Sequence, residues 1–151
     1  MLLNAARLRL IAGTSLMLAL AGCATGPAFD KPLVAPAAQA QVYLYRPWQF
    51  PGGAASLKLF VDGAPTELTL PNRSWQRVVL APGSHAFGLT EYLNQFSCGG
   101  ARVDLQAGQT VYLAVDFTLT GTGTVNHLSC VLVPRDEAQA LKDMAGLPLS
   151  K

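Results

Sequence analysis

The chain has 151 residues, of which half are hydrophobic and 13% are charged, with 11 Lys and Arg against nine Asp and Glu. The charges form no strongly basic stripe, which excludes nucleic acid as an expected partner. No long run of like charges suggests an interaction tail either.

Residues 1–22 have the pattern of a targeting segment. Arg7 and Arg9 give it a positive start, and the apolar run at 10–20 is shorter than the roughly 20 residues of a membrane span. Small residues then precede a predicted cleavage site. We expect residues 1–22 to be removed as a signal peptide, which lowers the count of Lys and Arg to nine and the formal net charge to zero.

The segment Leu-Ala-Gly-Cys at 20–23 resembles the lipobox of bacterial lipoproteins. The resemblance implies that cleavage falls before Cys23, that its thiol carries diacylglycerol and that its new amine is acylated. Two or more acyl chains anchor a protein stably, whereas one does so only marginally. Ala24 in place of Asp favours the outer membrane, with the protein facing the periplasm. The alternative is an ordinary signal peptide with an incidental cysteine.

Residues 23–40 are predicted to be a lipid-anchored tether rich in Pro and Ala. Three prolines and the lack of periodicity favour an extended chain of about 3.1 Å per residue. Such a tether could hold the following domain up to roughly 50 Å from the membrane. In the alternative arrangement, Phe29 or Val34 packs onto the domain.

Residues 41–151 are long enough for one hydrophobic core and too short for two. Turn signals at short intervals, with alternating apolar residues between them, predict an all-β fold. We expect a single small β-sandwich of about seven to eight strands. The predicted strands are 42–46, 57–61, 68–70, 75–80, 86–91, 101–105, 111–117 and 128–133.

The periodicity changes after residue 133. Pro134 suits a first helical turn, the acidic pair at 136–137 favours the positive end of a helix, and Gly146 is a stop signal. Apolar residues between them recur at helical spacing. We expect a short helix that packs on the sheet or covers one of its edges.

Four short motifs carry a family resemblance: YLYRP at 43–47, VDG at 61–63, LAPGSH at 80–85 and LQAGQTVY at 105–112. They resemble the DUF2846 family, a bacterial lipoprotein domain of unknown function that is similar to PEGA-type modules, the small β-sandwiches of bacterial surface proteins. The resemblance spans residues 41–145 and implies the same fold. The family has no assigned catalytic residues, so the resemblance transfers none to this chain.

Two cysteines remain if Cys23 is lipidated. Because the periplasm is oxidising, we expect a disulfide between Cys98 and Cys130, worth roughly 3–4 kcal/mol in the chain-entropy model. The alternative is two thiols too far apart to bond. The cysteines and the two histidines lack the paired spacing of zinc ligands, so we expect neither a metal nor another cofactor.

The candidates for catalysis are sparse. Ser84 and His85 are adjacent, so on a strand their side chains would point to opposite faces. The best alternative constellation is Asp116, His127 and Ser129, which lacks the context of a nucleophile elbow. We therefore expect that the protein is not an enzyme.

Aromatic residues make the stronger candidate site. Trp48 and Phe50 lie in a predicted loop beside Arg46, and Trp75 could join them to form a binding surface. We favour the interpretation in which the loop aromatics instead cap the core, because aromatic side chains contribute much to burying a small core. We expect a non-enzymatic interaction or structural module of the cell envelope with an envelope protein or glycan as partner. A small-ligand or glycan-binding lipoprotein is the alternative, and a hydrolase is the second alternative.

Overall fold

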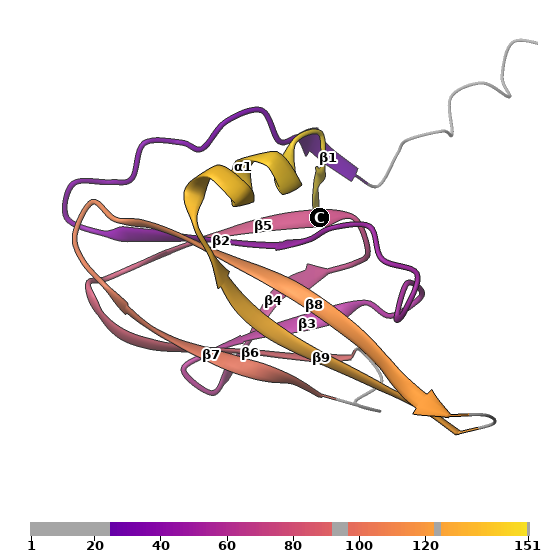
Figure 1. The fold of residues 1–151 in the computed structure, drawn as a ribbon. Helices are drawn as coiled ribbons and strands as arrows, with labels where there is room; N and C mark the ends of the chain where they lie inside the picture. The colour runs from indigo at the N-terminus through magenta and orange to yellow at the C-terminus, as the bar shows by residue number, and fades with distance from the viewer. Residues whose placement is uncertain (1–24, 92–96, 123–124, 151) are drawn as a thin grey trace, which may run out of the picture.

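The computed structural model describes residues 25–91, 97–122 and 125–150, so the predicted signal peptide and Cys23 lie outside the described residues. The described residues form ten strands and one short helix (Figure 1). In chain order these are β1 (Thr25–Ala28), β2 (Ala40–Arg46), β3 (Leu57–Val61), β4 (Ala64–Leu70), β5 (Ser74–Leu80), β6 (Gly83–Glu91), β7 (Ser97–Leu105), β8 (Thr110–Thr122), β9 (Val125–Arg135), α1 (Glu137–Met144) and β10 (Pro148–Ser150).

The predicted all-β class with a C-terminal helix is confirmed, but the sheet arrangement differs from a sandwich of two sheets. The strands join in one curled sheet with the order β1-β10-β5-β2-β8-β9-β7-β6-β3-β4. The eight predicted strands correspond to β2 through β9, and β1 and β10 are additional. Both extra strands are short and contain proline, which weakens their strand signal.

The curl of the sheet places β3, β4 and β6 opposite β2 and β8 (Figure 1). Strand twist and bulges produce this curvature, and one register shift lies between Phe87 and Leu89 where β6 pairs with β7. Where β4 approaches β5, the side-chain amide of Gln76 donates to the carbonyl oxygens of Thr69 and Ser150. The sheet therefore wraps around a single interior.

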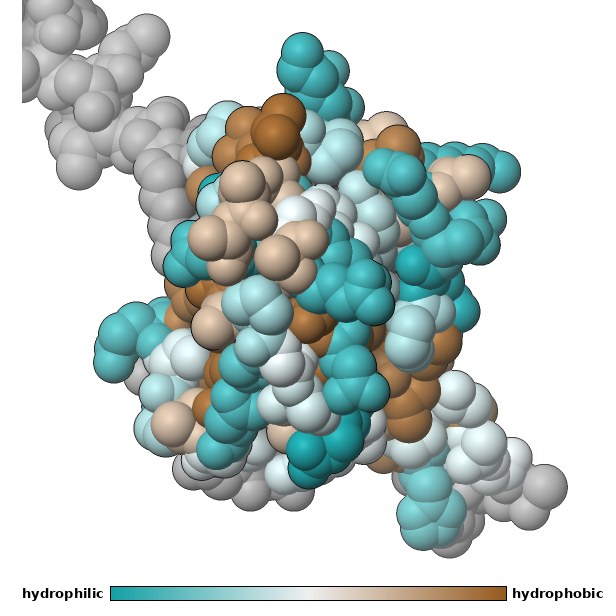
Figure 2. All heavy atoms as spheres, turned by 90° about the vertical axis from the view of Figure 1, so that its left-hand side faces the viewer, coloured by the Kyte–Doolittle hydropathy of each residue, from teal (hydrophilic) through white to brown (hydrophobic). Residues whose placement is uncertain are grey.

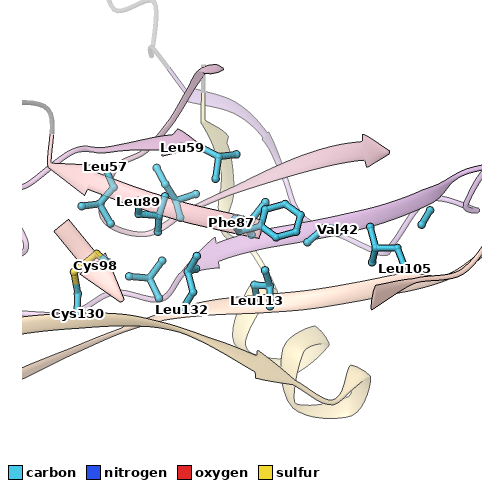
Figure 3. Close-up of a cluster of buried hydrophobic side chains, with 14 residues drawn as sticks. Val42, Leu57, Leu59, Phe87, Leu89, Cys98, Leu105, Leu113, Cys130 and Leu132 are labelled. Atoms are coloured by element: carbon cyan, nitrogen blue, oxygen red, sulfur yellow. A yellow bond between two sulfur atoms is a disulfide. The ribbon is translucent and has the colours of Figure 1, made fainter. Parts of the chain in front are cut away.

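This interior is filled by aliphatic and aromatic side chains (Figure 3). Alternate residues of a strand point to one face, so Leu44 of β2 and Leu113 of β8 both point inward. Leu59 and Phe87 meet them from the opposite wall. Each such side chain contributes roughly 1.5–3 kcal/mol through burial.

The outer face of β2 and β8 is buried as well. Tyr43, Tyr45 and Tyr112 point outward from these strands and form a second cluster with Ala140 and Met144 of α1. The helix thus covers a face of the sheet and not an edge. Its N-cap is Asp136, whose side chain accepts a hydrogen bond from the backbone N–H of Gln139. The predicted first residue of the helix, Pro134, instead lies in β9.

The segment that the sequence predicted as a flexible tether lies against this outer layer. Its strand β1 pairs with β10, and the backbone N–H of Phe29 donates to the carbonyl of Leu147 at 2.7 Å. The Phe29 ring is buried, edge-on to Tyr43. Farther along, the N–H of Leu33 donates to the Tyr43 hydroxyl at 2.8 Å. From residue 25 onward the structure therefore shows the alternative arrangement, in which Phe29 packs on the domain.

Cys98 and Cys130, the pair predicted from the sequence, are joined by a disulfide with their Cα atoms 4.6 Å apart (Figure 3). The bond links the start of β7 to β9, next to Gly99 and Val131, the register pair between these two strands. In the described part of the chain, no helix is long and apolar enough to span a bilayer.

Candidate functional site

Residues 47–56, which we call the aromatic loop, connect β2 to β3 at the right-hand end of the molecule in Figure 1. Trp48 is 67% exposed and Phe50 is 83% exposed. The favoured interpretation, in which these rings cap the core, is therefore wrong. Both side chains are directed to the surface from a loop attached to a rigid sheet, which is a common position for recognition residues.

Arg46, a predicted member of the binding surface, is fully buried beneath this loop. Its Nη1 donates to the carbonyl of Ala55 at 2.6 Å and its Nη2 donates to the carbonyl of Gly52 at 2.5 Å. The guanidinium also lies 4.6 Å from the centre of the Phe117 ring, in cation–π geometry. Arg46 therefore fixes the loop from inside and is not part of the exposed surface.

Burial lowers the pKa of Arg46 to about 10, so the guanidinium remains charged at neutral pH. A buried cation needs polar partners to offset the loss of water. Two loop carbonyls fill this role, whereas Nε has no hydrogen-bond partner. Moving the two carbonyls away would leave the buried guanidinium without hydrogen-bond partners, which costs free energy. The Arg46 charge therefore holds the loop backbone in this conformation.

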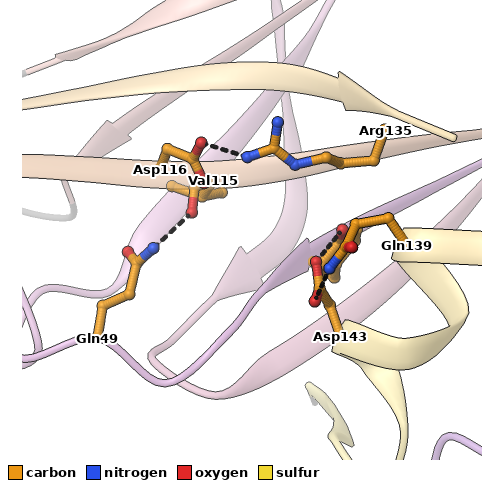
Figure 4. A network of polar contacts seen from close by, with 7 residues as sticks. Gln49, Val115, Asp116, Arg135, Gln139 and Asp143 are labelled. Atoms are coloured by element: carbon orange, nitrogen blue, oxygen red, sulfur yellow. Dashed lines mark hydrogen bonds and ion pairs between the residues drawn. The ribbon is translucent and has the colours of Figure 1, made fainter.

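Polar side chains fix the other side of the loop. The backbone of Gln49 both donates to and accepts from the side-chain amide of Asn72, at 3.1 and 3.0 Å. The side-chain amide of Gln49 donates to the carbonyl of Val115 in β8 (Figure 4). These bonds connect the loop to two separate parts of the sheet.

Gly52 allows the loop to approach β8 closely. A Cβ atom at this position would lie 2.5 Å from the Phe117 ring, and the backbone has a φ of +70°. Both the close approach and the left-handed conformation favour glycine. The contact joins residues far apart in the sequence, so no local pattern predicts it.

Trp75, the remaining predicted surface residue, does not join the aromatic loop. It lies in β5 and packs against Phe29 and Tyr43 in the outer cluster, with ring centres 5.4 and 5.8 Å away. Here a mainly apolar groove of about 400 Å³ opens beside the ring, and the indole N–H is buried without a hydrogen-bond partner. The groove is lined by Pro27, Ala28, Phe29, Asp30, Lys31, Leu33, Tyr43, Trp75 and Leu149.

His85 is held in a turn contact. Its Nδ1 lies 2.8 Å from Asp62 Oδ2, and its Nε2 lies 3.0 Å from the carbonyl oxygen of Ala81. The bond to Asp62 raises the pKa of His85. The pKa of the Asp62 carboxyl is lowered mainly by a hydrogen bond from the backbone N–H of Ala86 and, second, by the hydrogen bond with the His85 side chain. Both ring nitrogens face acceptors, so the protonated ring fits this position and tightens the β3–β4 and β5–β6 turns.

The predicted constellation of Asp116, His127 and Ser129 is not brought together. Asp116 accepts from Arg135 (Figure 4) and pairs in register with Val131 of β9. His127 is four residues from Val131 along the same strand, a rise of roughly 13 Å. Ser129 donates to the carbonyl of its register partner on β8. The three side chains therefore do not form a hydrogen-bonded triad.

No protein-family model matches the chain, and a search of curated proteins finds no match. Within the ranges that the structure describes, no group of three or more His, Cys, Asp or Glu side chains is placed to hold a metal ion. Among the described residues, the best-defined candidate binding site is thus the aromatic loop, in which two exposed rings lie above the buried Arg46 guanidinium.

Proposed function

We propose that the chain is a lipid-anchored, non-enzymatic interaction module of the bacterial cell envelope, held by Cys23 at the outer membrane and facing the periplasm. Its working surface is the aromatic loop. One observation carries the proposal: Trp48 and Phe50 are exposed although the backbone beneath them is fixed by Arg46.

A fixed loop has a physical advantage in binding. Ordering a flexible loop on association reduces affinity, so a surface that is already ordered loses less free energy. Aromatic side chains contribute a large share of binding energy at interfaces. A loop whose two aromatic rings are both exposed is therefore suited to recognition, since exposing such apolar surface to water is otherwise unfavourable.

The resemblance to PEGA-type modules remains part of this proposal. Its motifs lie on β2 and on the β3–β4, β5–β6 and β7–β8 turns, so they occupy successive turns of one sheet. We propose that the domain is a sandwich-like variant in which the two walls are continuous at β9 and β7. The recurrence of turn motifs supports a shared fold and says little about a partner.

Complementation of a deletion strain that has a measurable envelope defect tests the proposal. The double variant Trp48→Ala with Phe50→Ala should fail to restore the phenotype at normal abundance and normal melting temperature. The matched control is Val34→Ala, which removes a side chain that is 93% exposed on the segment leading to β2. Full complementation by the loop variant would contradict the proposed working surface.

The same assay tests the catalytic alternative. Asp116→Ala and His127→Ala should both complement, because the two side chains lie apart on β8 and β9. Failure of both at normal abundance would favour a hydrolase over an interaction module.

A second candidate function is the binding of a small apolar ligand in the groove beside Trp75. The observation that favours it is the combination of an apolar groove of about 400 Å³ with an unpaired indole N–H. Its volume lies in the range of small-molecule sites. A change in Trp75 fluorescence on titration with envelope lipid or glycan extracts, lost in Phe29→Ala, would support this function.

A further inference from the structure

The distance between the lipid and the fold is short. Strand β1 begins at Thr25, whose register partner is Ser150 in β10. Only Ala24 separates Thr25 from the proposed lipid on Cys23. Two peptide units span at most about 7 Å. Because residues 25–40 lie along the domain, they cannot act as a spacer, and the domain must lie next to the membrane surface.

In Figure 1 the aromatic loop and the start of β1 both lie in the right-hand half of the molecule, with β1 above the loop. Leu119 near the end of β8 is 52% exposed. Figure 2 views the molecule from the opposite end, where hydrophilic side chains project on several sides.

The aromatic loop and the parts of β8 and β9 beyond Asp116 contain no Lys, Arg, Asp or Glu, since the sequence has none at 47–57 and none at 117–134. Moving a charged side chain into a bilayer is costly, so the composition removes the main barrier to insertion. Tryptophan is enriched where membranes meet water, and Phe and Leu enter the boundary between headgroups and acyl chains.

We propose that the partner of the aromatic loop is the lipid bilayer itself, so that the domain docks on the membrane with Trp48 and Phe50 inserted into the interface. This inference rests on the proposed function, because it requires the anchor at Cys23 and names the partner of the same loop. A buried Arg46 then has a purpose: it holds the two rings in a shape ready for insertion without placing a charge at the surface.

Tryptophan fluorescence of the full lipidated protein in vesicles tests this docking. The chain has two tryptophans, so Trp75→Phe leaves Trp48 as the reporter. The vesicles contain phosphatidylethanolamine and phosphatidylglycerol, with or without bromine on the acyl chains. We expect bromine to quench Trp48 and the membrane to protect it from aqueous iodide, and Phe50→Ala in the same background should weaken both effects.

A partition measurement on protein without the lipid on Cys23 gives the affinity of the loop for the vesicles. The mature chain with Cys23→Ala should bind the same vesicles weakly, and Phe50→Ala should reduce this binding by about tenfold or more. Val34→Ala, equally exposed but on another segment, should leave binding unchanged.

Two outcomes would overturn the inference. Trp48 that stays open to iodide and unquenched by brominated lipid shows that the loop does not contact the bilayer. Protection of Trp48 that depends on protein concentration and persists without vesicles shows that a second copy covers the loop. Neither result decides whether Trp48 and Phe50 are needed in the cell, which the complementation assay tests separately. Absence of lipid on Cys23 would contradict the proposed anchor but not the binding of the loop to vesicles.

Discussion

Strand β2 and residues 112–115 of β8 are buried on both faces, and the two faces use different kinds of side chain. On the inner face, Leu44 and Leu113 pack against other apolar groups inside the curled sheet. On the outer face, Tyr43 and Tyr112 stack with their ring centres 5.6 Å apart under α1 and the N-terminal segment. The inner layer thus depends on close packing alone, whereas the outer layer combines packing with directed hydrogen bonds.

The tyrosine hydroxyls show this difference most clearly. Tyr45 donates to Asp143 of α1 at 3.0 Å, and Tyr112 donates to Glu137 at 3.3 Å. Burial raises the pKa of Tyr112 to about 12, and burial together with Asp143 raises that of Tyr45. An outer layer made of short segments needs such bonds to fix its position, while the inner layer is fixed by the sheet itself. We therefore expect inner changes to unfold the whole domain and outer changes to act locally.

The largest expected effect is in the inner layer. Leu113→Ala should lower the free energy of unfolding by about 4 kcal/mol, because it leaves a cavity at a fully buried site. Urea unfolding followed by circular dichroism measures the change. Leu119→Ala on the same strand is the control, and it should cost less than about 0.5 kcal/mol because this side chain is half exposed. Equal costs for the two variants would show that the inner layer is loosely packed.

The disulfide should have the next largest effect. Its sequence separation of 32 residues gives a loss of roughly 3–4 kcal/mol when Cys98–Cys130 is reduced. A lower urea midpoint in reductant measures this loss, and the double variant Cys98→Ala with Cys130→Ala should not respond to reductant. Unchanged stability in reductant would mean that the bond adds nothing to the contacts between β7 and β9.

A change in the outer layer should sharpen the contrast. Phe29→Ala should cost about 2 kcal/mol, less than a full cavity, because the N-terminal segment can detach by itself. Hydrogen exchange should accelerate at the Leu33 amide, which donates to Tyr43, and stay slow at Leu113. Val34→Ala on the same segment is the control. Faster exchange at Leu113 would show that the two layers unfold as one unit.

The smallest expected effect lies in the turns, outside both layers. The pKa of His85 is raised in the folded state, so its stabilising contribution is complete below the ordinary histidine value of about 6.5 and is lost as the pH rises through the raised value. The pKa of Asp62 is lowered, so its contribution is complete above about 3.9 and is lost as the pH falls through the lowered value.

The contact should therefore stabilise the domain most between roughly pH 4 and 6.5. The difference in melting temperature between the wild-type protein and His85→Gln should be small, largest in this window and smaller at pH 9. A difference that does not change with pH would show that the His85–Asp62 contact does not depend on charge.

Alternation predicted the inner layer well and the outer layer poorly. The odd-numbered residues of 111–117 were assigned to one face, and Leu113 and Val115 are indeed fully buried. Tyr112 and Ala114 on the other face are also buried, since a helix and the N-terminal segment cover them. Tyrosine and alanine occur on solvated and covered faces alike, so this burial depends on distant segments that local pattern does not reveal.

In the candidate site, too, local sequence predicted some features and missed those that depend on distant contacts. Trp48 and Phe50 were correctly predicted in a loop, but the favoured prediction that they cap the core is wrong, because both rings are exposed. Arg46 was placed on the surface because arginine is mostly exposed, but loop carbonyls bind it inside the fold. The contact of Asn72 with Gln49 joins two loops that are distant in sequence, so no local signal could predict it.

Under the proposed export and lipidation, the pairing of β1 with β10 would set an order of events. Thr25 cannot pair with Ser150 until the strands between them have crossed the membrane, and closing so long a loop is entropically unfavourable before the sheet exists. The residues next to Cys23 would therefore stay accessible while the following strands are still being translocated. Enzymes that act on Cys23 would meet an open chain, and the fold would close over the neighbouring segment only after the modification is complete.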